Sequence, residues 1–323
     1  MKKYLILVLI LTINTLFVPL ISYGMLSDYH SDGNSQQSDK TAELSYDTIS
    51  VYNADTDKVF TIDFRDYIIG VVAAEMPAEF HEEALSACAV AAATLARKKI
   101  AEGADGTIED AVISTDPAIH QAFMSAEKMK ERWGEDFTKY YEKIAAAVDK
   151  AIDYSITFEG ELIVAAYHAI STGKTESAEN IWTGGFPYLT SVESEGDRLS
   201  PGYKSELSLT FEDFREKMEN EGVSFAEDKT LWFHSAEYTD SGTLKTIKIG
   251  DKSFSGEELR DIFSLRSPSV SLTMNDEGVL FTVKGYGHGV GMSQYGADYY
   301  ARQGYTWQEI IKHYYQGTEI EIL

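Results

Sequence analysis

A run of alternating glycines late in the chain is the feature that most constrains its fold. Glycine occupies every second position at Gly285, Gly287, Gly289 and Gly291, and the run continues as Met292-Ser293-Gln294-Tyr295-Gly296. Because glycine lacks a Cβ, this stretch can adopt positive φ angles and its backbone can approach another group closely. We expect a strand-to-helix junction whose bare main chain meets a ligand. The alternative is a glycine-rich turn without a ligand.

Polar side chains gather at the same junction. His288 lies between the glycines, and Ser293, Gln294 and Tyr295 follow them where a helix N-terminus is expected. The run is not a phosphate-binding loop, because it has no Gly-Lys-Ser/Thr ending. The chain also has 28 basic against 52 acidic residues and a net charge of -24. This charge repels polyphosphates and anionic lipid headgroups, so it argues against nucleic-acid binding and polybasic membrane docking.

The N-terminus predicts a membrane anchor. A pair of lysines precedes an apolar run from Tyr4 to about Ile21, which as a helix nearly spans a hydrocarbon core. We expect residues 1–24 to form a retained signal-anchor, followed by a flexible linker over 25–43 and a folded domain over 44–323 outside the membrane. A cleaved secretory peptide is the alternative, since Ser22-Tyr23-Gly24 offers a weak cleavage site.

The order of predicted elements indicates an α+β fold of mixed helices and short antiparallel strands. The alanine-rich segment 82–101 is expected to be a central helix that is buried almost all round, and Cys88 within it is expected to pack as a small hydrophobe. Residues from about 205 to 270 are expected to form a smaller α/β region, inserted in or appended to the main domain. Other helices are predicted over 64–74, 138–154, 211–221, 256–263, 293–302 and 306–315, and strands over 48–52, 58–62, 156–158, 162–166, 270–274 and 279–284.

Three separate stretches carry a family resemblance. The glycine run is one, and Val71-Val72-Ala73-Ala74-Glu75-Met76-Pro77-Ala78 is another. The middle stretch includes Tyr167-His168, Gly173-Lys174-Thr175-Glu176, Ile181-Trp182 and Pro187-Tyr188-Leu189. Together they resemble the motifs of the stage II sporulation protein D family, over roughly Ser45 to Leu323.

The resemblance implies that the folded domain is catalytic, a lytic transglycosylase that cuts the bond between N-acetylmuramic acid and N-acetylglucosamine in peptidoglycan. Glu75 occupies the place of the family's catalytic glutamate. The apolar neighbours of Glu75 would raise its pKa if it is partly buried, which suits a general acid. The alternative is that Glu75 sits on the solvent side of a helix end.

Six further residues are expected to bind the glycan. Hydroxyl, amide, ammonium and aromatic groups are suited to N-acetyl groups and sugar rings. The candidates are Lys174, Thr175, Tyr188, His288, Gln294 and Tyr295. A zinc hydrolase built from His120, His168 and His288 is an alternative, although the chain has no His-Glu-x-x-His spacing. We expect no metal and no cofactor.

The chain departs from the family pattern at several positions. Ala93 and Leu95 stand where relatives usually carry Arg and Tyr, so a cation expected near the acid is missing. His120-Gln121-Ala122-Phe123 replaces a frequent Cys-Gln-x-Tyr, and the segment Ala169 to Gly173 differs from the usual Ser-Thr-Ser-Gly-Gly. These departures put in doubt full activity and the metal site of some relatives.

The resemblance also implies a setting and partners. The first hypothesis is a membrane-anchored enzyme on the extracytoplasmic face that remodels the septal wall during engulfment in sporulation. Its expected partners are peptidoglycan glycan strands, a partner amidase and a membrane protein of the engulfment machinery. The second hypothesis, motivated by Ala93 and the altered middle stretch, is a catalytically weakened glycan-binding activator of a partner cell-wall amidase.

Overall fold

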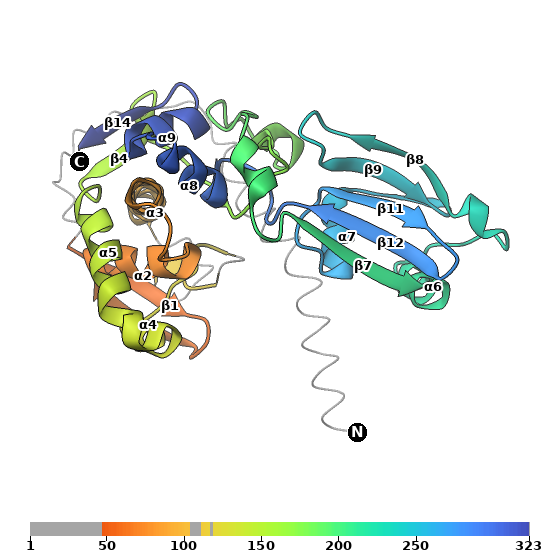
Figure 1. Ribbon diagram of the computed structural model, residues 1–323, viewed down its shortest axis with the longest axis horizontal. Coiled ribbons are helices and arrows are strands. Elements are labelled where there is room, and N and C mark those ends of the chain that lie inside the picture. Colours follow the sequence, from red (N-terminus) through yellow and green to blue (C-terminus); the bar gives the residue numbers. More distant parts are fainter. Residues whose placement is uncertain (1–46, 104–110, 117–118, 323) are drawn as a thin grey trace.

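The computed structural model describes residues 47–103, 111–116 and 119–322 and shows a mixed α+β fold (Figure 1). The predicted α+β class is confirmed. The expected anchor over 1–24 and the expected linker over 25–43 lie outside the described residues, so both stay predictions. Within the ranges that the structure describes, no helix is long and apolar enough to cross a membrane.

Two predicted strands open the fold. β1 (Thr48–Asn53) and β2 (Lys58–Asp63) pair antiparallel, and β3 (Ile113–Ser114) adds to β1 in parallel. A second parallel pair joins β6 (Tyr167–His168) to β13 (Met292–Ser293). These two parallel pairs differ from the antiparallel pattern that we expected, because each brings together segments that are far apart in the sequence.

The first helix ends at the predicted acid. α2 spans Phe64–Glu75, and the Asp63 side chain caps it by accepting hydrogen bonds from two backbone amides of the first turn. Met76 is extended, with φ -122° and ψ 142°, because the ring of Pro77 disfavours helical backbone in the residue before it. Glu75 is therefore the last residue of α2, where the chain leaves the helix.

An alanine-rich helix forms the centre of the first hydrophobic core. α3 spans Glu82–Glu102, and its residues from Ala84 to Thr94 are all buried. Figure 1 shows α3 nearly end-on, with α2, α5 (Phe137–Asp149), α8 (Gln294–Arg302) and α9 (Trp307–Tyr314) around it. Cys88 is fully buried on α3. The expected central helix and the packing role of Cys88 are thus confirmed.

The remaining elements of this core differ more from the predictions. α5 ends at Asp149 rather than near residue 154, because the chain turns there into β4 (Tyr154–Phe158). β4 forms the predicted hairpin with a shorter β5 (Glu161–Leu162) and pairs on its other side with β14 (Glu319–Ile322). α4 (Ala126–Trp133), which packs on α5, was not predicted. Short 3-10 turns lie at Gly134–Asp136, Ala178–Asn180, Glu195–Leu199 and Lys229–Leu231.

A second hydrophobic core interrupts the first in the sequence. Its centre is Phe214, whose ring stacks on that of Phe263 with 5.8 Å between centroids. The first core resumes at Val290. The smaller region that we expected over residues 205–270 stays a prediction. These bounds would exclude two strands of the second core, Val270–Met274 and Gly278–Lys284. The elements are β7 (Lys204–Thr210), β12 (Gly278–Lys284) and β11 (Val270–Met274) in one sheet, β8 (Phe233–Tyr238), β9 (Leu244–Ile249) and β10 (Lys252–Phe254) in another, and helices α6 (Phe211–Asn220) and α7 (Gly256–Phe263) (Figure 1).

A buried carboxylate joins the two cores. Glu176 is 2% exposed and accepts hydrogen bonds from the backbone amide of Ser177 and the side chain of Asn180. It also accepts hydrogen bonds from the hydroxyls of Thr239 and Ser241, which follow the last residue of β8 in the sequence. Burial alone would raise the pKa of Glu176, but these donors outweigh it and hold the pKa below its ordinary value. The ionised carboxylate therefore ties the turn between β8 and β9 to the first core.

Glu176→Gln is predicted to destabilise the fold, because an amide cannot accept every hydrogen bond that the carboxylate accepts. We expect a loss of roughly 2 kcal/mol at neutral pH, typical of a hydrogen-bonded charged group. Because the folded-state pKa is lowered, the stabilisation is present above the unfolded-state pKa and is lost as pH falls through the folded-state pKa. The difference in urea unfolding between wild type and variant should therefore shrink in acid. An equal loss in the exposed control Glu179→Gln would contradict this role.

Candidate active site

The alternating glycines dock against the chain's own middle segment. All four have positive φ angles, of 80° at Gly285, 99° at Gly287, 81° at Gly289 and 74° at Gly291. A Cβ on Gly291 would lie 2.0 Å from the carbonyl oxygen of Ala166, and one on Gly285 would lie 2.6 Å from that of Ile170. At Gly285 and Gly291 the chain's own segment 166–176 thus occupies the space where we expected a ligand, and ligand contact elsewhere in the run stays a prediction.

This docking fixes the start of α8. β13 pairs with β6 so that Ser293 lies opposite His168. The Ser293 hydroxyl accepts a hydrogen bond from the Gly296 amide and donates one to Asp197 across 2.6 Å. Asp197 is fully buried and also accepts from the backbone amide and hydroxyl of Ser171. The first residue of α8, Gln294, is therefore held at a defined place.

Gln294 meets the predicted acid directly. Its side-chain amide donates to one carboxylate oxygen of Glu75 across 3.1 Å, and the backbone amide of Ala122 donates to the other across 2.9 Å. Gln294 is 5% exposed, and Glu75 is partly buried. The fold thus brings together residues that are 219 positions apart. We expected Gln294 to bind substrate, but in the structure it contacts the acid itself.

The surroundings of Glu75 favour its protonated form. Burial raises the pKa of the Glu75 carboxyl, and the hydrogen bonds from Ala122 and Gln294 lower it by less. The end of α2 acts in the same direction as burial, because the last carbonyl groups of a helix carry partial negative charge. Both donors are neutral amides, so they orient the carboxylate without a countercharge. Glu75 therefore keeps its proton to higher pH than an exposed glutamate, as a general acid requires.

Two aromatic side chains belong to segments that meet at this contact. Tyr295 is partly exposed, and its ring lies edge-on to that of Phe80 with 4.9 Å between centroids. On the other side, the Tyr167 hydroxyl donates to Gln121 across 2.9 Å, one residue before the amide that binds Glu75. Tyr295 directly follows Gln294, and its expected contact with a glycan stays a prediction. Tyr167, which had not been assigned to the site, is linked to Glu75 through Gln121 and Ala122.

Two other predicted binding residues have structural roles instead. Thr175 is fully buried, and its hydroxyl accepts a hydrogen bond from the backbone amide of Val192 across 2.9 Å. Tyr188 is 8% exposed, and its hydroxyl accepts from the backbone amide of Val164 across 3.0 Å. Both side chains hold neighbouring segments of the first core together. We therefore correct their assignment from glycan binding to packing.

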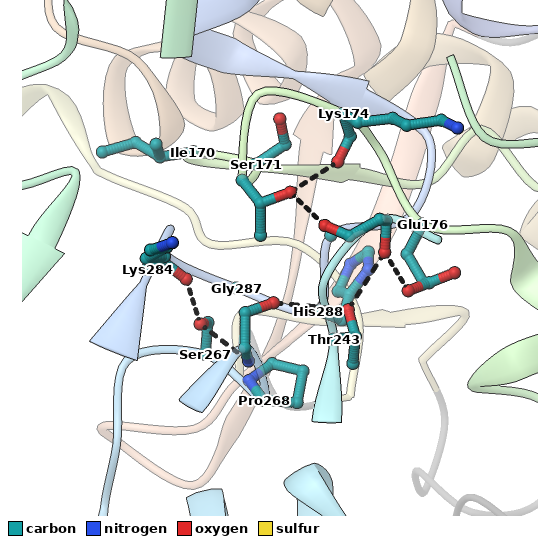
Figure 2. A pocket seen from close by; sticks show the side chains of 14 residues that line it. Ile170, Ser171, Lys174, Glu176, Thr243, Ser267, Pro268, Lys284, Gly287 and His288 are labelled. Atoms are coloured by element: carbon teal, nitrogen blue, oxygen red, sulfur yellow. Dashed lines mark hydrogen bonds between the residues drawn. The ribbon is translucent and has the colours of Figure 1, made fainter. Parts of the chain in front are cut away.

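Lys174 and His288 line a small cavity between the two cores (Figure 2). The cavity also borders Glu176 and Thr243, and its volume of about 10 Å³ leaves room for at most one water molecule. Figure 2 shows the Lys174 ammonium pointing away from the cavity. A sugar cannot enter this space, so any contact of these two residues with a glycan has to come from their outer faces.

The three histidines of the zinc-site alternative are not brought together. His168 and His288 lie with ring centroids 5.8 Å apart, whereas His120 accepts a hydrogen bond from the Ser114 backbone. Burial lowers the pKa of His168 to about 4 and that of His288 to about 3. In the part of the chain that the structure describes, no group of three or more His, Cys, Asp or Glu residues is placed to hold a metal ion.

Comparison with known proteins identifies the family. A family model described as "Stage II sporulation protein" matches residues 52–158. The chain is 36% identical to stage II sporulation protein D of Bacillus amyloliquefaciens, over 90% of this chain and 83% of that protein. It is 33% identical to the protein of the same name from Bacillus subtilis (strain 168), over 99% of this chain and 96% of that protein. The chain belongs to the stage II sporulation protein D family.

A more distant relative has a different name. The amidase enhancer of Bacillus subtilis (strain 168) is 26% identical to this chain, over 78% of this chain and 40% of that protein.

In this member of the stage II sporulation protein D family, Ala93 is fully buried within α3. The position at which the family pattern led us to expect Arg is thus part of the packed core here and supplies no cation to Glu75.

Sequence reasoning missed Ala122, Asp197 and Tyr167. Ala122 acts through its backbone amide, which any residue except proline supplies, so no side-chain pattern marks it. Asp197 lies outside the three stretches that resemble the stage II sporulation protein D family. Tyr167 is the first residue of the middle stretch, and this position in a motif was the one signal that could have marked it as a site residue.

The desolvation of Glu75 predicts a specific pH dependence of stability. A raised folded-state carboxyl pKa stabilises the fold fully below the unfolded-state pKa, and this contribution is lost as pH rises through the folded-state pKa. Glu75→Gln should therefore gain stability relative to wild type as pH rises over that window, measured by urea unfolding at several pH values. Glu82→Gln, which removes an exposed carboxylate from α3, is the control. A constant difference between Glu75→Gln and wild type across pH would show that Glu75 is not desolvated.

Proposed function

We propose that this member of the family is a peptidoglycan lytic transglycosylase with Glu75 as its single acid and base. The observation that carries the proposal is the contact of a partly buried Glu75 with two neutral donors, Ala122 and Gln294. This setting supplies a proton donor whose two oxygens have fixed directions. The family relationship supplies the cell-wall context, and it supports peptidoglycan as the substrate.

The proposed reaction needs one carboxyl group. Glu75 gives its proton to the glycosidic oxygen, the bond from that oxygen to C1 of N-acetylmuramic acid breaks, and N-acetylglucosamine leaves with a free 4-hydroxyl. The C6 hydroxyl of the same muramic acid bonds to C1 and returns its proton to Glu75. Hydrolytic glycosidases need a second carboxylate to handle water or a covalent intermediate. Here an internal nucleophile, already at high effective concentration, takes that role.

Gln294 acts on both protonation states of Glu75 in this scheme. After proton transfer the carboxylate is charged, and the amides of Gln294 and Ala122 already point at its two oxygens. Because these donors need no reorganisation, they lower the cost of forming the charge in a partly dry site. Gln294 is thus proposed to set how strong an acid Glu75 is, while Tyr295 beside it offers an aromatic face to the sugar.

The proposed setting follows from the family and from the N-terminal sequence. We propose that residues 1–24 anchor the protein and that the folded part acts on the extracytoplasmic side, at the septum of a sporulating cell. Its proposed partners are glycan strands, a partner amidase and a membrane protein of the engulfment machinery. A protein with a net charge of -24 is well soluble in this setting and has no electrostatic attraction to nucleic acid.

Glu75→Gln is predicted to abolish cleavage, because an amide cannot donate a proton to the leaving oxygen. We expect the rate to fall about 10²- to 10⁴-fold, as for the loss of a general acid. Purified glycan strands are digested with the soluble part of the protein, and the products are examined by mass spectrometry for 1,6-anhydro-muramic ends. The control is Glu79→Gln, which changes an exposed carboxylate nearby. Anhydro ends formed equally by Glu75→Gln would eliminate the mechanism.

Two observations favour a second function, the activation of a partner amidase. The product assay above, together with a binding measurement, distinguishes it from glycan cleavage. The similarity to an amidase enhancer and the buried Ala93 both suit a glycan-binding protein that activates a partner amidase without cutting the glycan itself. In that case wild type and Glu75→Gln would bind denuded glycan strands equally in calorimetry. Neither would produce anhydro ends.

Gln294→Leu is predicted to weaken Glu75 as an acid. The change removes one hydrogen bond to the carboxylate and leaves the site drier, and both effects raise the pKa of Glu75 further. The alkaline limb of the pH profile of kcat/KM should therefore move to higher pH, with a lower rate on the plateau. Gln303→Leu, an exposed change just beyond α8, is the control. An unchanged alkaline limb in Gln294→Leu would remove Gln294 from the proposed role.

A further inference from the structure

A cluster of three rings lies at the surface near the site and has no role in the chemistry at Glu75. Trp182 and Phe186 face each other edge-on with 6.0 Å between centroids, and the His288 ring lies 5.2 Å from that of Trp182. All three are partly exposed, and Thr183, Gly184 and Gly185 between the first two are exposed. The cluster belongs partly to the middle stretch of the sequence and partly to the glycine run.

The backbone holds this cluster in place. Trp182 donates its amide to the Ala178 carbonyl across 2.7 Å, and Leu189 donates to the Phe186 carbonyl across 2.9 Å. The amide of Ala178 in turn bonds to Leu189 across 2.9 Å, so both ends of the exposed loop are fastened to the same two residues. Phe186 also packs against the buried Tyr188. These contacts fix both ends of the exposed loop, which lowers the cost of ordering it when a ligand binds.

The cluster suits an uncharged ligand with flat apolar faces. The Val290 backbone amide donates a hydrogen bond to Nδ1 of His288, which leaves that nitrogen without a proton and the ring neutral, and the rings of Trp182 and Phe186 carry no charge. Aromatic faces contribute large apolar contact areas, and Trp182 keeps an indole N–H for polar contact. A pyranose ring has apolar C–H faces and hydroxyl edges. A neutral sugar therefore matches this surface better than a phosphate or carboxylate ligand does.

The cluster is connected to the proposed catalytic centre through Tyr167, Gln121 and Ala122. His288 hydrogen bonds to the backbone of Tyr167. The Tyr167 side chain bonds to Gln121, and the next residue, Ala122, donates its amide to Glu75. A chain of hydrogen bonds and one peptide bond thus links the cluster to Glu75.

We propose that Trp182, Phe186 and His288 form a sugar-binding subsite that stacks on one ring of the glycan, away from the bond at Glu75. The identity of the polymer rests on the proposed function, whereas the binding of a sugar ring to this cluster does not. Such a subsite holds a long strand in place during cleavage and contributes little to the binding of a disaccharide.

The test compares tryptophan variants in the Glu75→Gln background, where bound glycan is not consumed. Trp182→Ala should weaken the binding of denuded glycan strands about 10-fold in calorimetry, which corresponds to about 1.4 kcal/mol. Trp182→Phe should restore most of that affinity, because it keeps an aromatic face. The matched control is Trp133→Ala, which removes a partly exposed tryptophan from another ring cluster, with Phe137 and Tyr140. Thermal unfolding of each variant checks that the fold is intact.

The outcomes separate this subsite from the proposed function. If wild type forms anhydro ends but Trp182→Ala binds as tightly as Trp133→Ala, the subsite is wrong and the proposed function stands. If no anhydro ends form but Trp182→Ala still loses binding, the subsite stands and the enzyme assignment falls. If Trp182→Ala and Trp182→Phe lose affinity equally, aromatic stacking is excluded. If the Glu75→Gln protein does not bind the strands at all, the subsite is refuted.

Discussion

The close docking of the glycine run against residues 166–176 is the constraint on which the site depends. Gly291 lies where any Cβ would meet the Ala166 carbonyl at 2.0 Å, so only glycine lets β13 pair with β6. That pairing sets Ser293 at the N-cap of α8, and the next side chain, Gln294, reaches Glu75. The glycines therefore serve the site by bringing two distant segments into register.

Two buried carboxylates in this fold show how the same group acquires opposite properties. Glu176 receives four hydrogen bonds, two of them from hydroxyls, and these lower its pKa despite burial. Glu75 receives two, from neutral amides, at the C-terminal end of α2, and burial prevails to raise its pKa. The first is an ionised link between the cores at neutral pH, and the second is a group that can exchange a proton. The balance between desolvation and hydrogen-bond donors thus distinguishes the structural carboxylate from the proposed catalytic one.

The parts of the fold that local chemistry determines could be predicted from the sequence. Asp63 caps α2, and Ser255 forms a complete capping box with Glu258 as its sequence pattern indicates. The contact partners of Glu75 could not be predicted, because the amide of Ala122 has no side-chain signature and the approach of Gln294 depends on a long-range strand pair. Thr175 was misassigned for a related reason: a motif residue can belong to the docking surface of the motif rather than to its ligand.

Hydrogen bonds of Glu176 connect the second core to the candidate active site. Its carboxylate is held by Thr239 and Ser241 of the second core, while its backbone amide donates to the Gly289 carbonyl across 2.8 Å. Gly289 lies in the run that positions α8, so Glu176 links the turn between β8 and β9 to the glycine run. Since the docking of that run places Gln294 against Glu75, loosening the Glu176 joint would alter the acid without any change in the residues that touch it.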